Sequence, residues 1–461
     1  MSDFLIGLLT LLFFAGCTVG PNYKKPALEI PSQYRGVTAE QQAASFGNQK
    51  WWDTFQDDAL RDLIHTALEQ NYDVRIAAAR ILEAQAVLGI TRADQFPTVN
   101  AGASAARERV PKTLASPALE TSAFQVSSSL NWELDFWGKF RRATESARAN
   151  LLAEEWAQRQ VVSTLVSDVA SSYFELRELD LELEISRQTL ASRQDSLRLT
   201  NILADRGATS MLDVRQAEQL VFTASATIPA LEDRIQEQEN FISILIGRNP
   251  ESIPRGKKLV DQPHASEVPA GLPSTLLERR PDIQQAEQEL IAANAQIGVA
   301  KAQYFPQILL TVAGGFQSAA LGDLFSGPAG LWTVAGSVAQ PIFQGGRIKN
   351  RVKFAEARTQ ETTLLYQQTV QEAFRDVSDS LVRYQKSQQV RAELEQLTNS
   401  AQEAQRLSNM RYKGGRASYL EVLDSDTRYF TAQISLAQSQ LNELEALVQI
   451  YRSLGGGWQQ P

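Results

Sequence analysis

The strongest constraint on the fold is that the sequence repeats itself after about 208 residues. Residues 73–97 align without a gap with residues 282–306, at 282 − 73 = 209, and both stretches end in Phe-Pro. Three later blocks keep nearly this spacing: 136–138 with 343–345, 207–214 with 415–422, and 222–224 with 430–432. Blocks that hold their register over most of each half indicate a tandem duplication, so each structural feature of one half should occur twice.

Both halves show the same order of predicted elements. A helical stretch (57–94 and 274–303) ends at Phe-Pro, because proline bars a helix from continuing and favours extended conformations before it. Two extended segments follow, then two long helical stretches separated at a glycine. We therefore expect six regions: a signal peptide (1–16), a lipid-anchored extended segment and collar (17–56), a first repeat (57–247, hairpin about 98–137), a linker or collar (248–273), a second repeat (274–455, hairpin about 307–343) and a tail (456–461).

The long helical stretches have the apolar spacing of coiled coils. Spacings of three and four alternate from Val214 through Val221 to Ile235, and an equivalent seam runs from Leu423 to Tyr451. An ordinary helix bundle has the same spacing. However, the longest stretches would reach roughly 100 Å at ~1.5 Å per residue, which a compact bundle does not need. The predicted ranges are about 139–206, 210–246, 347–412 and 418–454.

The extended segments have the pattern of half-buried strands. In residues 123–136 apolar side chains from Phe124 to Phe136 alternate almost strictly with polar ones from Gln125 to Asp135. Weaker versions of the pattern occupy 98–109, 307–317 and 332–338. Such alternation is typical of a transmembrane β-strand and also of a soluble sandwich strand. No later segment offers about 18 uncharged apolar residues, so any membrane passage is expected to be made by strands.

The N-terminus has the features of an exported lipoprotein. The apolar run 4–15 fits the core of a secretory signal peptide, and the chain's single cysteine, Cys17, follows two small residues as in a bacterial lipobox. We expect Cys17 to carry N-acyl and S-diacylglycerol lipid, and Thr18 after it to direct the protein to the outer membrane. The alternative is a signal peptide with an incidental cysteine, because Phe14 replaces the usual leucine and Asp3 stands where a positive charge is usual.

Four strands per chain imply an oligomer, because four strands cannot close into a barrel and a bilayer does not tolerate open sheet edges. Two copies would give eight strands and an interior filled by side chains. Three copies would give twelve strands and space for a lumen. We therefore expect a homotrimer with quasi-sixfold symmetry, because each copy contributes two similar hairpins.

Composition argues against several other classes of protein. The net charge of −8 disfavours nucleic-acid binding, which requires a basic surface. The chain has two histidines and lacks the HExxH, GxSxG and P-loop motifs, so we expect neither an enzyme nor a metal or other cofactor site. A structural coiled-coil lipoprotein or a periplasmic adaptor remains the alternative, although an adaptor would lack the four strands.

Several blocks of the sequence resemble the TolC/OprM-type outer-membrane efflux lipoproteins, the NodT-like outer-membrane factors of tripartite systems. The blocks are residues 17–26, 51–55, 278–283, 293–298, 304–306 and 341–347. The resemblance implies a mixed α and β membrane protein: a homotrimeric duct with a twelve-stranded outer-membrane β-barrel, four strands per protomer, and a long periplasmic α-helical coiled-coil barrel.

The same resemblance implies a function and its partners. Such a duct passively conducts drugs or other small molecules to the exterior, together with a periplasmic adaptor and an inner-membrane pump, here expected to be of the RND type. The outer-membrane exit of a type I protein secretion system is the alternative. The cargo is not specified by the sequence, because a duct conducts whatever its pump delivers.

The resemblance further implies that the duct closes at its two helix–turn–helix tips, which correspond to Gly207 and Gly415. Acidic side chains line the constriction in the family, and the matching positions are Asp213, Glu421 and Asp424. Threefold symmetry would turn each into a ring of carboxylates that favours cations; the alternative is three solvated acids on a helix face. Three residues beside the second tip are candidates for a latch: Arg411, Tyr412 and Arg416.

Overall fold

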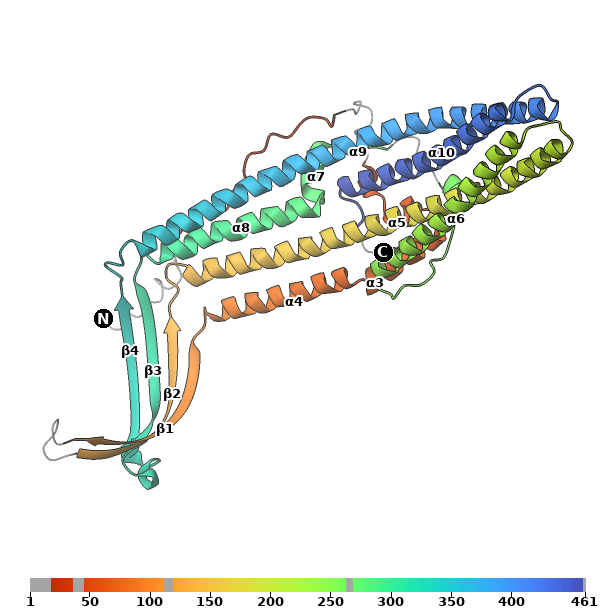
Figure 1. Ribbon diagram of the computed structural model, residues 1–461. Helices are drawn as coiled ribbons and strands as arrows, with labels where there is room; N and C mark the ends of the chain where they lie inside the picture. The colour runs from red at the N-terminus through yellow and green to blue at the C-terminus, as the bar shows by residue number, and fades with distance from the viewer. Residues whose placement is uncertain (1–17, 36–44, 112–118, 263–267, 459–461) are drawn as a thin grey trace. The chain divides into compact units, whose positions relative to one another are not determined.

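In the computed structural model, which describes residues 18–35, 45–111, 119–262 and 268–458, the chain forms two compact units. The first unit comprises residues 1–27, 80–155 and 285–367, and the second comprises 28–79, 156–284 and 368–461. Each unit therefore takes segments from both halves of the duplicated sequence. Figure 1 labels the elements.

The duplication is visible in the lengths of the helices. Helices α4 (Tyr72–Ala93) and α8 (Pro281–Ala302) each have 22 residues, and α5 (Lys139–Asp205) and α9 (Arg347–Lys413) each have 67. Helices α6 (Met211–Leu245) and α10 (Tyr419–Ser453) each have 35. The two halves thus build the same three long helices at an almost constant spacing, 347 − 139 = 208 for α5 and α9.

The two shorter helical stretches are interrupted, which the sequence pattern did not predict. The first divides into α3 (Asp58–Gln70) and α4, because the Asn71 side chain caps the new start by accepting from the backbone N–H of Asp73 (2.7 Å). The second divides into α7 (Pro273–Arg279) and α8 at Arg280, which precedes a proline and is therefore held extended.

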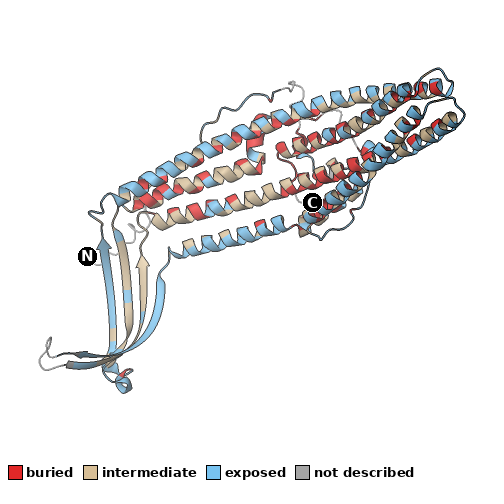
Figure 2. Cartoon of the chain, viewed as in Figure 1, coloured by how far each residue is buried: buried red, intermediate tan, exposed pale blue. Residues whose placement is uncertain are grey.

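The four predicted extended segments are strands of one antiparallel sheet in the first unit. They are β1 (Thr98–Val110), β2 (Leu119–Glu133), β3 (Gln307–Ser318) and β4 (Gly330–Ala339), in the order β1-β2-β3-β4. Strands β1 and β4 each pair on one side only and are largely exposed, whereas β2 and β3 are of intermediate burial (Figure 2). The sheet therefore has two unpaired edges within the described chain.

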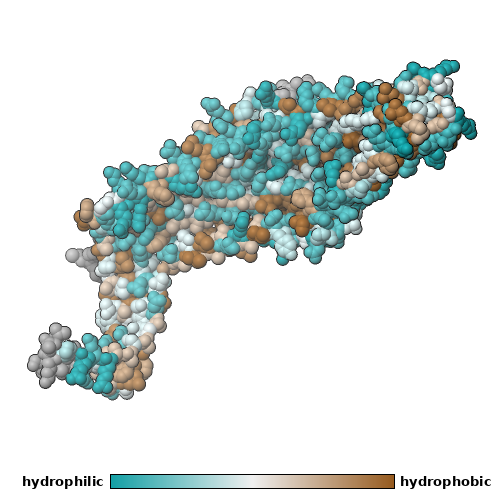
Figure 3. All heavy atoms as spheres, in the orientation of Figure 1, coloured by the Kyte–Doolittle hydropathy of each residue, from teal (hydrophilic) through white to brown (hydrophobic). Residues whose placement is uncertain are grey.

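The strands and the helices differ in surface polarity. On the face seen in Figure 3, most of the sheet is pale to brown, whereas the helices are mainly teal. Among the described residues, no helix combines the length and the apolar character needed to cross a membrane.

In the first unit, the N-terminal segment is fastened to the helices and to the strand–helix junction. The Val19 N–H donates to the carbonyl of Trp137 (3.0 Å). Gly20 has a φ of +102°, and a β carbon at this position would lie 2.6 Å from the Cα of Gly298. Only glycine permits this backbone and this approach, so the segment is held where it crosses α8.

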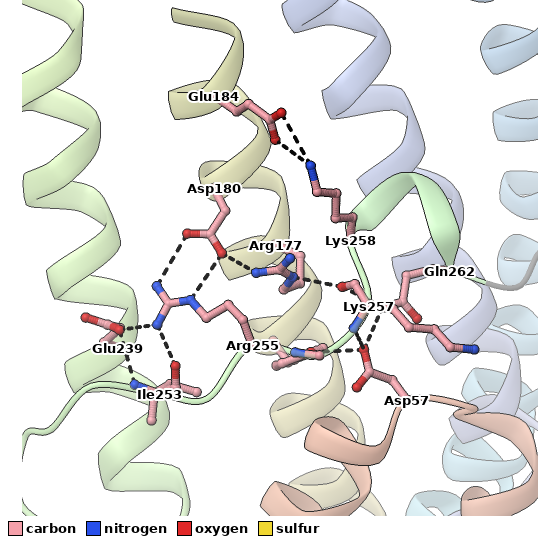
Figure 4. Close-up of polar contacts among 12 residues, drawn as sticks. Asp57, Arg177, Asp180, Glu184, Glu239, Ile253, Arg255, Lys257, Lys258 and Gln262 are labelled. Atoms are coloured by element: carbon pink, nitrogen blue, oxygen red, sulfur yellow. Dashed lines mark hydrogen bonds and ion pairs between the residues drawn. The ribbon is translucent and has the colours of Figure 1, made fainter. Parts of the chain in front are cut away.

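In the second unit, a buried carboxylate fixes the linker between the two repeats (Figure 4). Asp57, 1% exposed, caps α3 through Oδ1, which accepts from the backbone N–H of Ala59 (3.0 Å). Its Oδ2 accepts from the Tyr173 hydroxyl (3.0 Å), the Lys257 N–H (2.9 Å) and the Gln262 amide (2.8 Å). One side chain thus joins α3, α5 and the linker.

Replacing Asp57 with asparagine should destabilise the second unit. An amide offers only one acceptor oxygen, so at least one buried donor would lose its partner, at a cost of about 2 kcal/mol or more. The midpoint of thermal unfolding, followed by circular dichroism in detergent, should fall clearly. Asp58→Asn is the matched control, because the neighbouring Asp58 side chain is 89% exposed. Equal midpoints for the two variants would contradict the assignment.

Candidate functional site

The predicted turn glycines directly follow the two longest helices. Gly207 and Gly415 have φ of +70° and +67°, and in each turn the next residue's N–H donates back to a carbonyl of the helix. These bonds join Ala208 to Leu203 (2.8 Å) and Arg416 to Arg411 (2.9 Å). Glycine is needed here because the left-handed conformation strains other residues. Both turns therefore have the same helix-ending geometry.

The three predicted acids lie at the starts of the helices that follow these turns. Asp213, in the first turn of α6, is of intermediate burial and accepts from the hydroxyl of Thr209. Glu421, in the first turn of α10, is 3.6 Å from Nη2 of Arg411. Asp424 accepts from Arg428 (2.8 Å), and both side chains are mostly exposed. Such exposed ion pairs contribute little stability, so Glu421 and Asp424 can exchange these partners at little cost.

The three latch candidates occupy different environments. Tyr412 is 8% exposed and packs edge-on against Tyr419, with ring centroids 5.3 Å apart, in a cluster with Ala217 of α6. Its hydroxyl has no hydrogen-bond partner among the described atoms. The Arg411 guanidinium donates to the carbonyl of Arg416 (3.5 Å), and the Arg416 side chain is exposed. Tyr412 is therefore a packing residue within this single chain.

A buried ion pair that sequence analysis missed joins all four long helices of the second unit. Nε of Arg193 (α5) donates to Asp426 (α10) at 2.8 Å, and the two side chains are 3% and 9% exposed. Arg193 also donates to the Leu220 carbonyl of α6 (3.1 Å), and Gln405 of α9 donates to Asp426 (2.8 Å). One signal was available: Asp426 lies three residues after Leu423, on the apolar seam, where a charge needs a buried partner.

This ion pair borders a groove formed by the long helices of the second unit. The groove has a volume of about 1180 Å³ and lies along α5 and α9. Its lining mixes polar side chains, among them Asp195, Gln402 and Arg406, with apolar ones such as Leu220 and Val422. It therefore lies between the two helical hairpins, with the buried pair in its wall.

A second buried acid lies farther along α5. Glu178 is 2% exposed and one of its oxygens has no hydrogen-bond partner among the described atoms. Burial, followed by the hydrogen bond and charge of Glu182, raises the pKa of Glu178 to about 8, although Arg234 acts in the opposite direction. The Glu178 carboxyl is therefore protonated at neutral pH.

The predicted lipid attachment residue, Cys17, lies outside the described residues. The next residue, Thr18, packs against Gly138 at the strand–helix junction. A β carbon at Gly138 would lie 2.7 Å from the methyl group of Thr18. In the described part of the chain, no three His, Cys, Asp or Glu side chains are grouped to hold a metal ion.

Comparisons with known proteins give a consistent result. The family model described as "Outer membrane efflux protein" matches residues 63–248 and again 272–456. The chain is 37% identical to the solvent efflux pump outer membrane protein SrpC of Pseudomonas putida, over 98% of this chain and 97% of that protein. It is 33% identical to the cation efflux system protein CusC of Escherichia coli, over 99% of both chains. A crystal structure of a membrane protein from Pseudomonas aeruginosa matches with a TM-score of 0.90 at 33% identity, covering 96% of this chain and 98% of that one.

Replacing Asp426 with asparagine should cost about 3 kcal/mol or more, because it leaves the Arg193 charge buried without its counterion. The expected result is a lower midpoint of thermal unfolding and faster proteolysis of the helical hairpins. Asp424→Asn is the matched control. Asp424 lies two residues before Asp426, and its replacement removes the same charge from an exposed ion pair. A variant at Asp426 as stable as this control would show that the ion pair is dispensable.

Glu178 should make stability depend on pH. Because the folded protein binds this proton more tightly than the unfolded chain, the stabilisation is complete below the ordinary pKa of 4.5 and is lost as the pH rises through about 8. Glu178→Gln should flatten this decline in the unfolding midpoint between pH 5 and 9. Glu184→Gln, at a more exposed position on the same helix, should leave it unchanged. Equal slopes for the two variants would refute the assignment.

Proposed function

Because the chain belongs to the outer membrane efflux protein family, we propose that three copies of it form the exit duct of one tripartite efflux pump. The protein is an outer-membrane efflux channel that extends into the periplasm. Its proposed role is passive conduction, with no catalytic step of its own. The sheet with two unpaired edges is the observation that carries the trimer.

Strand directions support closure by identical copies. Neighbouring strands in the order β1-β2-β3-β4 are all antiparallel, so β4 of one copy and β1 of the next also run in opposite directions. Each added copy can therefore continue the same antiparallel pattern, and three copies give a closed ring of twelve strands. Closure satisfies the edge N–H and C=O groups that lipid cannot.

The N-terminal region supports a lipid anchor on Cys17, after removal of residues 1–16. Thr18 and Val19 are held at the strand–helix junction of the first unit, by Gly138 and by the Trp137 carbonyl. A lipid on the preceding residue would therefore enter the bilayer beside the strands. The two proposed repeats, 57–247 and 274–455, then supply one hairpin each to the ring.

We place the gate at the turns after α5 and α9. Threefold symmetry would turn Asp213, Glu421 and Asp424 into rings of carboxylates, which attract cations and repel anions. The buried pair of Arg193 and Asp426 ties the two hairpins of one chain together, because neither charge can be left alone in a dry interior. We infer that opening moves the two hairpins of a copy as one body, against those of its neighbours.

The latch candidates fit this gate in two ways. Nη2 of Arg411 lies 3.6 Å from a carboxylate oxygen of Glu421, and both side chains are exposed. Arg411 can therefore exchange Glu421 for an acid on a neighbouring copy. Tyr412 and Tyr419 form the packed base on which the second turn is built. Arg416, exposed beside them, is available to an acid of another copy.

The relatives define the proposed partners and cargo. SrpC is named for solvent efflux and CusC for cation efflux, so small solutes are the proposed cargo. A periplasmic adaptor and an inner-membrane RND pump are the proposed partners. These names favour efflux over the type I protein-secretion alternative. Co-expression with candidate adaptor and pump pairs would separate the two alternatives. Efflux should give resistance to solvents or metal ions, whereas type I secretion should give export of a protein.

The proposed function predicts a trimeric, cation-selective channel. The detergent-extracted protein should have the mass of three chains by light scattering and should conduct in planar bilayers. Changing Asp213, Glu421 and Asp424 together to amides should lower the cation preference, read from the reversal potential in a salt gradient. The matched control changes three exposed acids of α3: Asp58, Asp62 and Glu69.

Two results would count against these assignments. Unchanged selectivity in the gate variant, with a conducting trimer intact, would remove the acidic rings and leave the duct. A stable, non-conducting monomer would overturn the duct itself.

A further inference from the structure

The two β-hairpins of the first unit differ at the ends farthest from the helices, although they are equivalent in the duplicated sequence. Strand β3 pairs with β2 only as far as Ser318, which lies opposite Phe124, whereas β1 continues to pair with β2 beyond this position. The ends of β1 and β2 therefore project past β3 as a two-stranded ribbon (Figure 1). This ribbon carries Arg107 and Arg109. Their equivalents in β3, at the spacing of 209, are Phe316 and Ser318.

The register places both arginines on the face of the sheet that carries its apolar side chains. Side chains alternate between the two faces of a strand, so Arg107 and Arg109 share a face with Ala105 of β1. Ala105 pairs with Phe124, which belongs to the apolar face of β2. The other face of β2 carries polar side chains at alternate positions from Gln125 to Asn131. In the proposed duct the arginines therefore lie on the side that meets lipid.

Aromatic residues mark both ends of the apolar part of this face. Phe124 and Trp132 of β2 are separated by 132 − 124 = 8 residues. This is roughly 27 Å along the strand, or about 20 Å of depth at a tilt of ~40°, close to the ~25 Å apolar band of outer-membrane barrels. Phe316 and Phe325 pack together near the outer end, with ring centroids 5.6 Å apart. Arg107 lies roughly 7 Å beyond Phe124 along the ribbon, at the depth where lipid headgroups replace acyl chains.

The charges on this face of the ribbon are unbalanced. The Arg107 guanidinium lies 3.1 Å from one carboxylate oxygen of Glu120, and that of Arg109 lies 3.6 Å from the other. Two positive charges thus share one acid, and the arginine side chains are 77% and 72% exposed. Exposed ion pairs are weak, so an anion can compete with the carboxylate at little cost. Phosphate is the anion that suits this pair, because a guanidinium can donate two parallel hydrogen bonds to it.

We propose that Arg107 and Arg109 bind a phosphate group of a lipid headgroup in the outer leaflet of the outer membrane, at one site in each copy of the chain. This inference rests on the proposed duct, which determines the face that meets lipid. The occupant is a lipid because the arginines continue an apolar face and lie just beyond its aromatic end. Glu108, on the other face of the ribbon, disfavours phosphate on the side of the lumen. The second hairpin has Phe316 at the equivalent position and lacks this site.

The test is binding of lipid A, a phosphorylated glycolipid, to the full-length protein in detergent, measured by native mass spectrometry. The unchanged protein should bind lipid A in preference to phosphatidylcholine, whose phosphate is balanced by a choline cation. Arg107→Gln with Arg109→Gln should weaken binding about tenfold or more, because hydrogen bonds to charged groups are lost. The matched control is Arg187→Gln with Arg198→Gln, which removes two exposed, acid-paired arginines from α5.

Two further measurements distinguish a lipid site from other roles of the arginines. Glu120→Gln removes the competing carboxylate and should strengthen lipid A binding about threefold. Weaker binding in this variant would show that the ion pairs only hold the ribbon together, and would overturn the site. Inorganic phosphate at the same concentration should leave lipid A bound. Displacement of lipid A by inorganic phosphate would overturn the assignment to a lipid.

The outcomes also separate this inference from the proposed function. Light scattering and conductance in planar bilayers report the duct independently of lipid A. A conducting trimer that binds lipid A equally well without Arg107 and Arg109 would overturn the site and leave the duct in place. An equal loss of binding in the control pair would overturn the site as well, because binding would then follow total charge. A non-conducting monomer would overturn both the site and the duct.

Discussion

Among the described residues, the outer edges of β1 and β4 carry backbone N–H and C=O groups that no other strand pairs with, and these groups determine how the sheet can be completed. A strand edge in water can hydrogen-bond to solvent, whereas an edge in hydrocarbon cannot, and each unsatisfied group there costs several kcal/mol. Four strands are too few to bring their own edges together. The described sheet therefore needs further strands, which in the proposed duct come from other copies of the chain.

The helical part follows a related rule. Its surface carries many exposed ion pairs of little energetic value, such as Arg428 with Asp424. Its interior has a few polar links that are difficult to break, among them Asp57 with its five donors and Arg193 with Asp426. Both kinds of contact suit the proposed gate: the buried links would keep each hairpin pair intact, and the exposed pairs would be exchanged as the turns move.

Duplication has given the two halves of the chain the same helices with different burial at equivalent positions. Helices α5 and α9 share their length, yet Ser146 is 3% exposed and its equivalent, Phe354, is 74% exposed. The side chains at equivalent positions have thus changed while the lengths of the helices stayed the same. The family model accordingly matches the chain twice, once in each half.

The sequence by itself determined the kinds of element, their order and most of their extents, because these depend on local chemistry. Phe-Pro ends α4 and α8, glycine turns follow α5 and α9, and alternation marks the strands. Even so, the breaks at Asn71 and Arg280 were missed, although Pro281 was an available signal for the second one. Only the tertiary structure decided which distant residues meet. Arg193 and Asp426 are 233 positions apart, and Tyr412 is buried against Tyr419, seven positions away across the turn. Heptad spacing is satisfied by any shift of one helix along another by a whole repeat, so the sequence pattern leaves open the register that brings such pairs together.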